Sequence, residues 1–273
     1  MPELPEVETI RNELLPYVVG RNISGVTLFW ERMLRQVTPA EFYSRILGRR
    51  INGVTRRGKY LIFSLSGSDS LIVHLKMSGS LLIGKDSSPP PRYTSAIIQL
   101  DNGSNIFFRD PRKFGTIQLV KDKSSILSKL GPEPLEPDFT PCLLAERLSK
   151  HKAPIKAVLI DQSFIAGIGN MYADETLFAT GIHPLKPANS LSRKEIQRLH
   201  QAIRQVLWSA IGNKGASVRS YFRPSGETGT AHFHFQVAHR GGKSCPVCDT
   251  PIERIPIRHR GSYFCPKCQP END

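Results

Sequence analysis

The segment Gly131-Pro132-Glu133-Pro134-Leu135-Glu136-Pro137 divides the sequence into two parts with different hydrophobic patterns. Proline lacks a backbone N–H and has a fixed φ angle, so three prolines in this short stretch exclude a helix or a central strand. We therefore expect a linker over residues 131–140, a domain of residues 1–130 before it and a helical domain of residues 141–235 after it.

Short β-rich runs occupy the first part, and turn residues separate them. They lie at residues 25–29, 60–63, 71–75, 96–100, 105–108 and 116–119. Many short strands at this spacing predict a β-sandwich or a barrel-like domain. Ahead of them, Val7, Ile10 and Leu14 have helical spacing, which predicts an N-terminal helix over residues 3–17 with Pro5 in its first turn.

The second part has helical spacing. We predict helices over residues 144–150, 155–161, 170–180 and 192–211. Ser192 and Glu195 have the spacing of a capping box at the start of the last helix, and Gly212 marks its end. The expected fold class is therefore α+β, with an N-terminal helix and β-sandwich followed by a helical domain.

The charge balance indicates a polyanionic partner. The 273 residues include 37 Lys and Arg against 24 Asp and Glu, a net charge of +13. A positive field of this size attracts nucleic acid and speeds its encounter with the protein. An anionic membrane surface is the second candidate, but the sequence lacks a basic amphipathic helix to bind one. Charge alone leaves open a basic protein without a polyanionic partner.

Membrane insertion and secretion are not expected. No apolar run approaches the ~20 residues of a membrane span. The start Met1-Pro2-Glu3-Leu4-Pro5-Glu6 is acidic and proline-rich, whereas a secretory signal begins with basic residues followed by an apolar run. We expect a cytosolic protein.

Four cysteines near the C-terminus have the spacing of a metal site. Cys245 and Cys248 form one C-x₂-C pair, Cys265 and Cys268 form another, and sixteen residues separate the pairs. This pattern predicts a four-thiolate zinc site in a small domain over residues 236–273. Because all four positions are cysteine, no coordination position remains for water, and we expect one structural zinc ion. Two disulfides are the alternative, which a reducing compartment disfavours.

Two loops in the β-rich part carry side chains that are unusual in turns. The loops are His74-Leu75-Lys76-Met77-Ser78-Gly79 and Asp110-Pro111-Arg112-Lys113-Phe114-Gly115. An apolar Met, an Arg and a Phe on turns are suited to opening a duplex and filling the vacated space. The alternative is that Met77 and Phe114 belong to the core, where large apolar side chains are usually found.

A glycine-containing turn in the helical part has the character of an anion site. In the sequence Gly167-Ile168-Gly169-Asn170, the glycines allow close approach of a ligand, and we expect Asn170 to cap the following helix. Lys152 and Lys156 lie just upstream, where they can pair with a phosphate. Arg260 is one of several cations between the cysteine pairs. A simple interhelical turn and a solvated basic face remain the alternatives.

The N-terminus offers a nucleophile. If Met1 is removed, Pro2 becomes a secondary α-amine with a pKa near ~8, against ~10.4 for lysine, so more of it is neutral at pH 7. Its attack on a sugar C1′ gives an iminium ion, which acidifies C2′ and permits β-elimination of the phosphate. The neighbouring Glu3 can act as general acid or base. A Met-Pro start without any chemical role is the alternative.

These segments together resemble the formamidopyrimidine-DNA glycosylase family over nearly the whole chain. In order, the resemblance is carried by residues 2–9, 57–60, 74–79, 110–115, 130–135, 167–175, 181–184 and the cysteine pairs. The start Leu4-Pro5-Glu6-Val7-Glu8-Thr9 resembles this family more than the related endonuclease VIII.

The resemblance implies a helix–two-turn–helix domain that ends in a zinc hairpin, with DNA between the two halves. It implies a bifunctional glycosylase and abasic-site lyase that excises oxidised purines such as formamidopyrimidines and 8-oxoguanine in base excision repair. Pro2 is then the Schiff-base nucleophile and Glu3 the proton donor to the sugar. Lys59 and Arg260 are the proton donors for β- and δ-elimination.

The implied partner is damaged double-stranded DNA, bound by a monomeric cytoplasmic protein that works at the nucleoid. The implied DNA contacts are His74, Met77, Tyr93, Arg112, Phe114, Lys152, Lys156 and Asn170. Met77, Arg112 and Phe114 fill the gap left by the flipped nucleotide, and Arg112 faces the orphaned base. Lys156, Asn170 and Arg260 hold phosphates, and Glu6 is a further acidic residue near the site.

The sequence departs from the family pattern at several positions. Arg92-Tyr93-Thr94-Ser95 replaces a Lys-His-Asp-His type stretch, so that Tyr93 occupies the place of a DNA-contacting histidine. Lys76 stands where glycine is usual, while Ser220 and Thr230 replace a usual aspartate and a usual aromatic residue. We expect these changes to affect lesion preference and affinity. An endonuclease VIII-like enzyme for oxidised pyrimidines and a non-catalytic damage-binding protein are the alternative functions.

Overall fold

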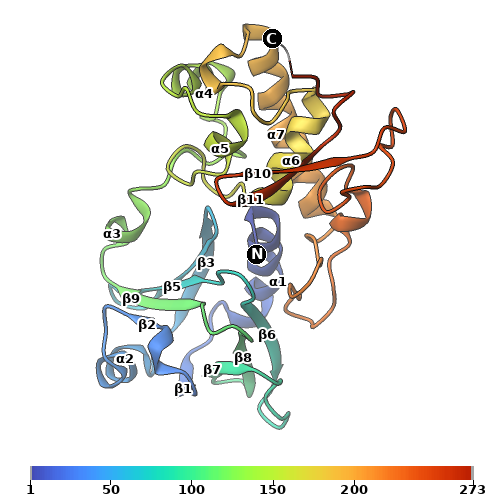
Figure 1. The fold of residues 1–273 in the computed structure, drawn as a ribbon. Coiled ribbons are helices and arrows are strands. Elements are labelled where there is room, and N and C mark those ends of the chain that lie inside the picture. The colour runs from blue at the N-terminus through green and yellow to red at the C-terminus, as the bar shows by residue number, and fades with distance from the viewer. Residues whose placement is uncertain (1, 272–273) are drawn as a thin grey trace. The chain divides into compact units, whose positions relative to one another are not determined.

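The chain folds into two compact units. The computed structural model describes residues 2–271 (Figure 1). Unit 1 comprises residues 2–128 and 213–232, and unit 2 comprises residues 129–212 and 233–271. Among the described residues, no helix combines the length and the apolarity that a membrane span requires.

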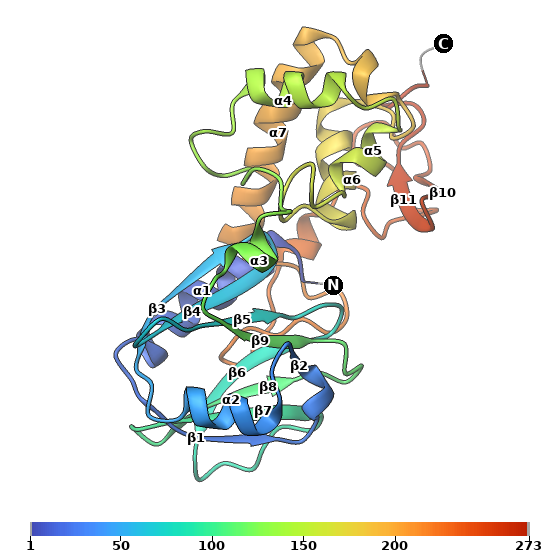
Figure 2. The same cartoon turned by 90° about the vertical axis from the view of Figure 1, so that its left-hand side faces the viewer.

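Unit 1 contains two sheets, which Figure 2 shows as separate layers. The four-stranded sheet has the order β1 (Ile23–Leu28), β7 (Thr94–Leu100), β8 (Ser104–Arg109), β6 (Ser80–Lys85). The five-stranded sheet has the order β2 (Leu34–Arg35), β9 (Thr116–Val120), β5 (Ser70–His74), β4 (Tyr60–Leu65), β3 (Ile51–Arg57). All neighbouring strands are antiparallel except β2 and β9, which are parallel. The predicted sandwich of short strands is confirmed.

Helix α1 (Leu4–Val18) packs on the five-stranded sheet. Its predicted apolar face is confirmed, because Val7, Ile10 and Leu14 are fully buried in a core shared with both sheets. The helix runs antiparallel to β3: Glu8 Oε2 accepts from Arg56 Nε (2.8 Å), and farther along the helix Arg11 Nε donates to the carbonyl of Val54 (3.3 Å). The start of α1 therefore lies near the end of β3. Two short helices complete this part, α2 (Pro39–Ile46) and α3 (Ser124–Leu127).

Three segments cross from one sheet to the other at the same end of the sandwich. Residues 29–33 connect β1 to β2, residues 75–79 connect β5 to β6, and residues 110–115 connect β8 to β9. The strand register fixes their common position. His74 pairs with Thr116, and Arg109 pairs with both Ser80 and Thr94. We call this the crossover end of the sandwich.

Residues 213–232 return to unit 1, although the predicted helical domain of residues 141–235 included them. The buried Glu6 accepts the N–H of Ala216 at Oε1 (2.8 Å), and Arg223 pairs with Glu13 (2.8 Å). Tyr221 is buried in the core of unit 1. This segment contains only the short 3₁₀ turn η3 (Ala231–His234) at its end, so hydrophobic periodicity cannot assign it to either unit.

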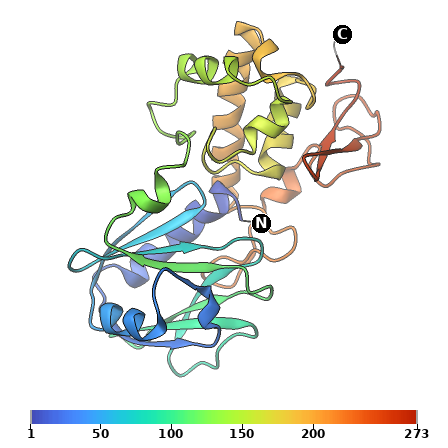
Figure 3. The ribbon, with the colours of Figure 1, turned by 60° about the vertical axis from the view of Figure 1, so that its left-hand side comes forward.

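Unit 2 consists of helices and a C-terminal hairpin. The helices are α4 (Pro141–Ser149), α5 (Ile155–Leu159), α6 (Asn170–Thr180) and α7 (Arg193–Gly212). The predicted capping box of α7 is present, since Ser192 N–H donates to Glu195 (2.8 Å) and Glu195 N–H donates to Ser192 Oγ (3.3 Å). Strands β10 (Glu253–Ile257) and β11 (Arg260–Phe264) form the hairpin, which Figure 3 shows in dark red.

The proline-rich segment contains no helix or strand, as its composition predicts, but it is an integral part of unit 2. Gly131 N–H donates to the carbonyl of Gln162 (2.8 Å), and Ala166 N–H donates to the carbonyl of Pro132 (3.0 Å). These bonds hold the segment against the turn between α5 and α6.

We expect Glu6→Ala to destabilise unit 1 by about 2 kcal/mol or more, because two buried backbone N–H groups lose their acceptor. Arg223→Ala is the matched control: it removes a half-exposed ion pair from the same segment and is expected to cost about 1 kcal/mol or less. Urea unfolding of both variants measures the difference. Equal losses of stability would contradict the assigned role of Glu6.

Candidate nucleic-acid interface and zinc centre

A buried carboxylate fixes the two loops at the crossover end. Asp110 is 2% exposed. Its Oδ1 accepts from the hydroxyl of Ser78 and from the N–H of Arg112 (3.2 Å), while its Oδ2 accepts from the N–H of Gly115 (2.7 Å). A Cβ at Gly115 would lie 2.5 Å from the ring of Phe108, which leaves room only for glycine. Asp110 therefore joins loop 110–115 to loop 75–79.

The side chains of Met77, Arg112 and Phe114, on the two loops that Asp110 holds, form one cluster that faces solvent. Met77 is 44% and Phe114 49% exposed, so the interpretation of both as core residues is wrong. Arg112 Nη1 lies 3.2 Å from Met77 Sδ, and its guanidinium carbon lies 4.7 Å from the centroid of the Phe114 ring. We call Met77, Arg112 and Phe114 the wedge cluster.

His74 lies at the same end as a neutral imidazole. Its Nδ1 accepts from the N–H of Lys76 (2.9 Å), and its ring meets Tyr60 edge-on at 4.5 Å between centroids. Burial, with the charges of Lys76 and Lys59 adding to it, lowers the pKa of His74 to about 3. Because Nδ1 is occupied as an acceptor, the ring proton is on Nε2, and His74 is an uncharged N–H donor.

Lys76 adopts a left-handed backbone conformation with φ +53°. A lysine pays a conformational cost there that a glycine avoids.

Pro2, Glu3 and Lys59 lie at the crossover end. Lys59 is 5% exposed and belongs to the turn between β3 and β4. Glu3 is buried and caps α1: its carboxylate accepts from the N–H of Glu6, and its own N–H donates to Glu6 Oε2 (2.7 Å). The buried Pro2 precedes this cap, near the end of β3. Met1, whose removal the chemistry requires, lies outside the described residues.

Tyr93, which occupies the place of the family's histidine, is 46% exposed and directly precedes β7. Its ring lies near two guanidinium groups, at 4.6 Å from Arg92 and 5.7 Å from Arg109. Arg109 also lies 5.1 Å from the ring of Phe222, in the returning segment 213–232. Tyr93, Arg92, Arg109 and Phe222 thus form a connected set of cation–π contacts.

In unit 2, three of the predicted phosphate ligands lie close to one another. Asn170 Nδ2 donates to the carbonyl of Gly261 (2.8 Å), which directly follows the exposed Arg260 in the hairpin. Lys156 Nζ donates to the carbonyl of Asn170 (2.7 Å). The expectation that Asn170 caps α6 is wrong, because Gly169 is the N-cap and the Asn170 side chain reaches the hairpin instead.

Lys156 is fully buried, whereas Lys152 is exposed on the segment before α5. The ammonium of Lys156 forms an ion pair with Asp174, which is also buried. Burial raises the pKa of Asp174 to about 7 although Lys156 lies beside it. A phosphate contact through Lys156 stays a prediction, since the ammonium group is not at the surface of this structure.

The four predicted zinc ligands converge. The Sγ atoms of Cys245, Cys248, Cys265 and Cys268 all lie within 4.8 Å of one another. Three of the separations are 3.4, 3.5 and 3.8 Å, far longer than the ~2.05 Å of a disulfide. They agree with the roughly 3.8 Å edge of a tetrahedron whose Zn–S bonds are about 2.3 Å. The cluster is suited to binding one zinc ion, and all four of its donor groups are thiols.

Residues that the sequence analysis did not select attach the zinc hairpin to the helices. Gln269 Nε2 donates to the carbonyl of Ile182 (2.9 Å), and its Oε1 accepts from the N–H of Cys265 (3.0 Å). The buried Glu175 on α6 accepts three backbone N–H groups, from residues 236, 237 and 238, at 2.7–2.9 Å. The only sign of this role in the sequence is that Glu175 is an acidic residue on an otherwise apolar face of its helix.

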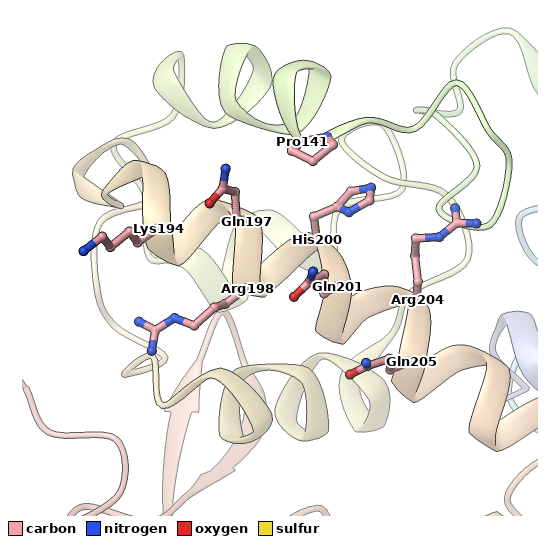
Figure 4. A pocket seen from close by; sticks show the side chains of 8 residues that line it. All are labelled: Pro141, Lys194, Gln197, Arg198, His200, Gln201, Arg204 and Gln205. Carbon is pink, nitrogen blue, oxygen red and sulfur yellow. The ribbon is translucent and has the colours of Figure 1, made fainter.

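A pocket of about 1060 Å³ lies along the outer face of α7 (Figure 4). Its lining residues are Pro141, Lys194, Gln197, Arg198, His200, Gln201, Arg204 and Gln205. None of the predicted site residues lines it. His200 Nε2 contacts the carbonyl of Phe139 (2.6 Å) and Arg204 donates to the carbonyl of Pro134 (3.0 Å), so these two side chains hold the proline-rich segment.

We expect the His74 imidazole to stay neutral well below the pKa of 6.5 that it has in the unfolded chain. A base whose folded pKa is depressed contributes its full stability above the unfolded pKa and loses it as the pH falls toward the folded value of about 3. Two-dimensional NMR of the ring nitrogens should show an unchanged Nε2–H tautomer from pH 8 to 5. Protonation of His74 near pH 6 would contradict the assignment, and His74→Asn should flatten the acid limb of the stability curve.

Zinc should be bound at one ion per chain and be lost in Cys265→Ser. Loss of the metal removes the cross-link between the cysteine pairs, so the melting temperature should fall and backbone N–H groups of residues 242–270 should exchange faster. Cys142→Ser is the control, because this exposed cysteine lies outside the cluster. Metal analysis and hydrogen exchange give the result, and full zinc occupancy in Cys265→Ser would contradict the site.

Comparisons with known proteins agree with this geometry. The family model of the formamidopyrimidine-DNA glycosylase N-terminal domain matches residues 1–117, and that of the H2TH domain of the same enzymes matches residues 130–221. A zinc finger found in FPG and IleRS matches residues 242–270. Together these matches cover most of unit 1, helices α4 to α7 and the zinc hairpin.

Relatives match along the full chain. The formamidopyrimidine-DNA glycosylase of Chloroflexus aurantiacus is 47% identical over 272 residues, covering 98% of each chain, and that of Geobacillus kaustophilus is 43% identical, covering 98% of this chain and 100% of its own. The Lactococcus lactis protein, solved in complex with an abasic-site-containing DNA, is 35% identical with a TM-score of 0.92, covering 98% of this chain and 100% of its own. The MutM protein of Thermus thermophilus is 38% identical with a TM-score of 0.90 and full coverage of both chains. The chain therefore belongs to the formamidopyrimidine-DNA glycosylase family.

Proposed function

We propose that this protein is a base excision repair enzyme, a DNA glycosylase with abasic-site lyase activity that acts on oxidised purines. The observation that carries the proposal is the crossover end of unit 1. A buried N-terminal Pro2, the buried Lys59 and an exposed wedge cluster lie at this one end of the sandwich. A protein that only recognised damage would have no use for a secondary amine and a buried lysine at the same end of the sandwich.

The proposed reaction begins once Met1 has been removed. The Pro2 nitrogen attacks C1′ of the damaged nucleoside, the C1′–base bond breaks and the base leaves with a proton. Protonation of O4′ by Glu3 then breaks the C1′–O4′ bond and opens the sugar ring, which leaves an iminium ion at C1′. The iminium ion withdraws electrons from C2′, whose proton is lost, and the bond from C3′ to its phosphate oxygen breaks. Elimination of the second phosphate then follows, from C5′.

The proposed proton donors match their surroundings. Glu3 serves the sugar, Lys59 serves β-elimination and Arg260 on the zinc hairpin serves δ-elimination. Lys59 is buried at the end of the sandwich where Pro2 lies, which is where a proton donor for β-elimination has to act. Glu6 holds Glu3 through its backbone N–H and so positions the N-terminus.

The DNA contacts are proposed on both units. On unit 1, Met77 and Phe114 enter the space of the flipped nucleotide, Arg112 faces the orphaned base, and His74 and Tyr93 contact the backbone. On unit 2, Lys152, Lys156, Asn170 and Arg260 hold phosphates, and the zinc ion keeps the hairpin folded. We further propose a monomer that works on the nucleoid in the cytoplasm.

Borohydride trapping tests the function. Protein whose N-terminal mass shows that Met1 is absent should form a reduced covalent complex with a duplex containing 8-oxoguanine. Pro2→Gly should reduce trapping at least tenfold, since the nucleophile changes while the other proposed site residues are retained. Lys194→Ala, on the outer face of α7, is the control and should trap normally.

The same assay separates the competing functions. Preferential trapping on an oxidised pyrimidine such as thymine glycol would favour an endonuclease VIII-like enzyme over the proposed one. Tight binding without trapping or nicking would favour a non-catalytic damage-binding protein. A mature protein that retains Met1 and still traps would refute the role of Pro2.

A further inference from the structure

The third crossover, residues 29–33, carries aromatic side chains that the proposed function does not use. It lies at the same end of the sandwich as loops 75–79 and 110–115. The backbone N–H groups of Phe29 (2.9 Å) and Trp30 (3.1 Å) both donate to the carbonyl of Ser95, so the segment is tied to β7. Phe29 is nevertheless 57% exposed, and Trp30 is partly exposed. The ring of Phe29 is therefore exposed at the surface, whereas the ring of Trp30 packs against the core of unit 1 and exposes only part of its area.

Two cations lie on the ring of Trp30. Lys113 Nζ is 4.5 Å and Arg32 Cζ 5.5 Å from its centroid, both within the range of a cation–π interaction. Lys113 directly follows Arg112 in loop 110–115, so the contact joins the third crossover to the loop that carries the wedge cluster. We call Phe29, Trp30, Arg32 and Lys113 the aromatic patch. Glu31 is the acidic residue of the same segment.

The composition of the aromatic patch fits nucleic acid. Single exposed aromatic residues are common on protein surfaces and need no explanation. Here two of them are adjacent, interleaved with cations, and continuous with a proposed DNA-binding surface. Aromatic rings that stack on bases or sugars, combined with cations that pair with phosphates, are the usual means of binding a nucleic-acid strand without sequence preference.

We propose that the aromatic patch binds the undamaged DNA strand next to the orphaned base. This inference rests on the proposed function, in which Arg112 faces that base. Lys113 is the next residue along the loop, and its side chain extends to Trp30. The strand that carries the orphaned base is therefore the one nearest to the patch, and the patch lengthens the contact with that strand.

Tryptophan fluorescence tests the contact directly, because the chain has two tryptophans, Trp30 and Trp208. Trp208→Phe leaves Trp30 as the sole tryptophan. Trp30→Phe leaves Trp208, a half-exposed residue on α7, as the sole tryptophan and serves as the control. The probe is a duplex with a stable abasic analogue at its centre. Its binding is followed in parallel by anisotropy of a labelled strand.

Emission from Trp30 should change by at least a fifth when the duplex saturates the protein. The change should disappear when the undamaged strand is shortened to end at the orphaned base on one of its two sides. Shortening the damaged strand should leave the change in Trp30 emission unaltered. Unchanged Trp30 emission when the duplex saturates the protein would overturn the inference. A change in emission that requires the full damaged strand and not the full undamaged strand would also overturn it.

Affinity gives a second measurement. Trp30→Ala should weaken binding of the full duplex roughly five- to tenfold, the effect of one lost stacking contact. Lys113→Ala should lower the slope of log K against log salt by about one. Trp208→Ala should change neither quantity, and unchanged binding in both patch variants would contradict the proposal.

Failure of this inference can be told apart from failure of the proposed function. If Pro2-dependent trapping succeeds while Trp30 stays silent, only the aromatic patch is wrongly assigned. If trapping fails on the 8-oxoguanine duplex and binding fails on the abasic-analogue duplex, the proposed function itself is refuted.

Discussion

The carboxylate of Asp110 is the constraint on which the interface of unit 1 depends. It is buried between two loops that connect different sheets, and it accepts hydrogen bonds from both of them. Loops of this kind are ordinarily the most mobile parts of a sandwich. With Asp110 in place, Met77 and Phe114, which are side chains typical of a core, are held beside Arg112 at the surface, where all three are available to a ligand. The buried side chain of Asp110 thus determines the position of the exposed wedge cluster.

A second buried carboxylate links the chemistry of the N-terminus to a distant part of the chain. Glu6 accepts the N–H of Glu3 with one oxygen and that of Ala216 with the other. The start of α1 and the returning segment 213–232 therefore share one acceptor. Each oxygen of Glu6 accepts from one buried backbone N–H group. If either segment moves and takes the Glu6 carboxylate with it, the N–H group of the other segment loses its acceptor. The position of the proposed nucleophile and the conformation of the returning segment are consequently coupled within unit 1.

The fold was largely predictable because its strongest elements have simple periodicity. The α1 face, the capping box of α7 and the four-cysteine cluster follow from spacing alone. Strands β3 and β6 were missed, since Asn52-Gly53 and Gly84 interrupt their apolar pattern. The return of residues 213–232 to unit 1 depends on single hydrogen bonds, which no pattern encodes. The exposure of Met77 and Phe114 was predicted from the family resemblance and not from hydrophobic periodicity. The burial of Lys156 was predicted neither by periodicity nor by the resemblance.

The neutral state of His74 has a consequence for a repair protein in a living cell. A protonated histidine would strengthen its hold on phosphate as the surroundings became more acidic, and would also draw the protein toward undamaged DNA. An imidazole whose pKa lies near 3 does neither, because its charge does not change within the range of acidity that a cell interior reaches. The contact that we propose between His74 and the DNA backbone is therefore insensitive to acid stress, a condition that itself promotes loss of purines from DNA.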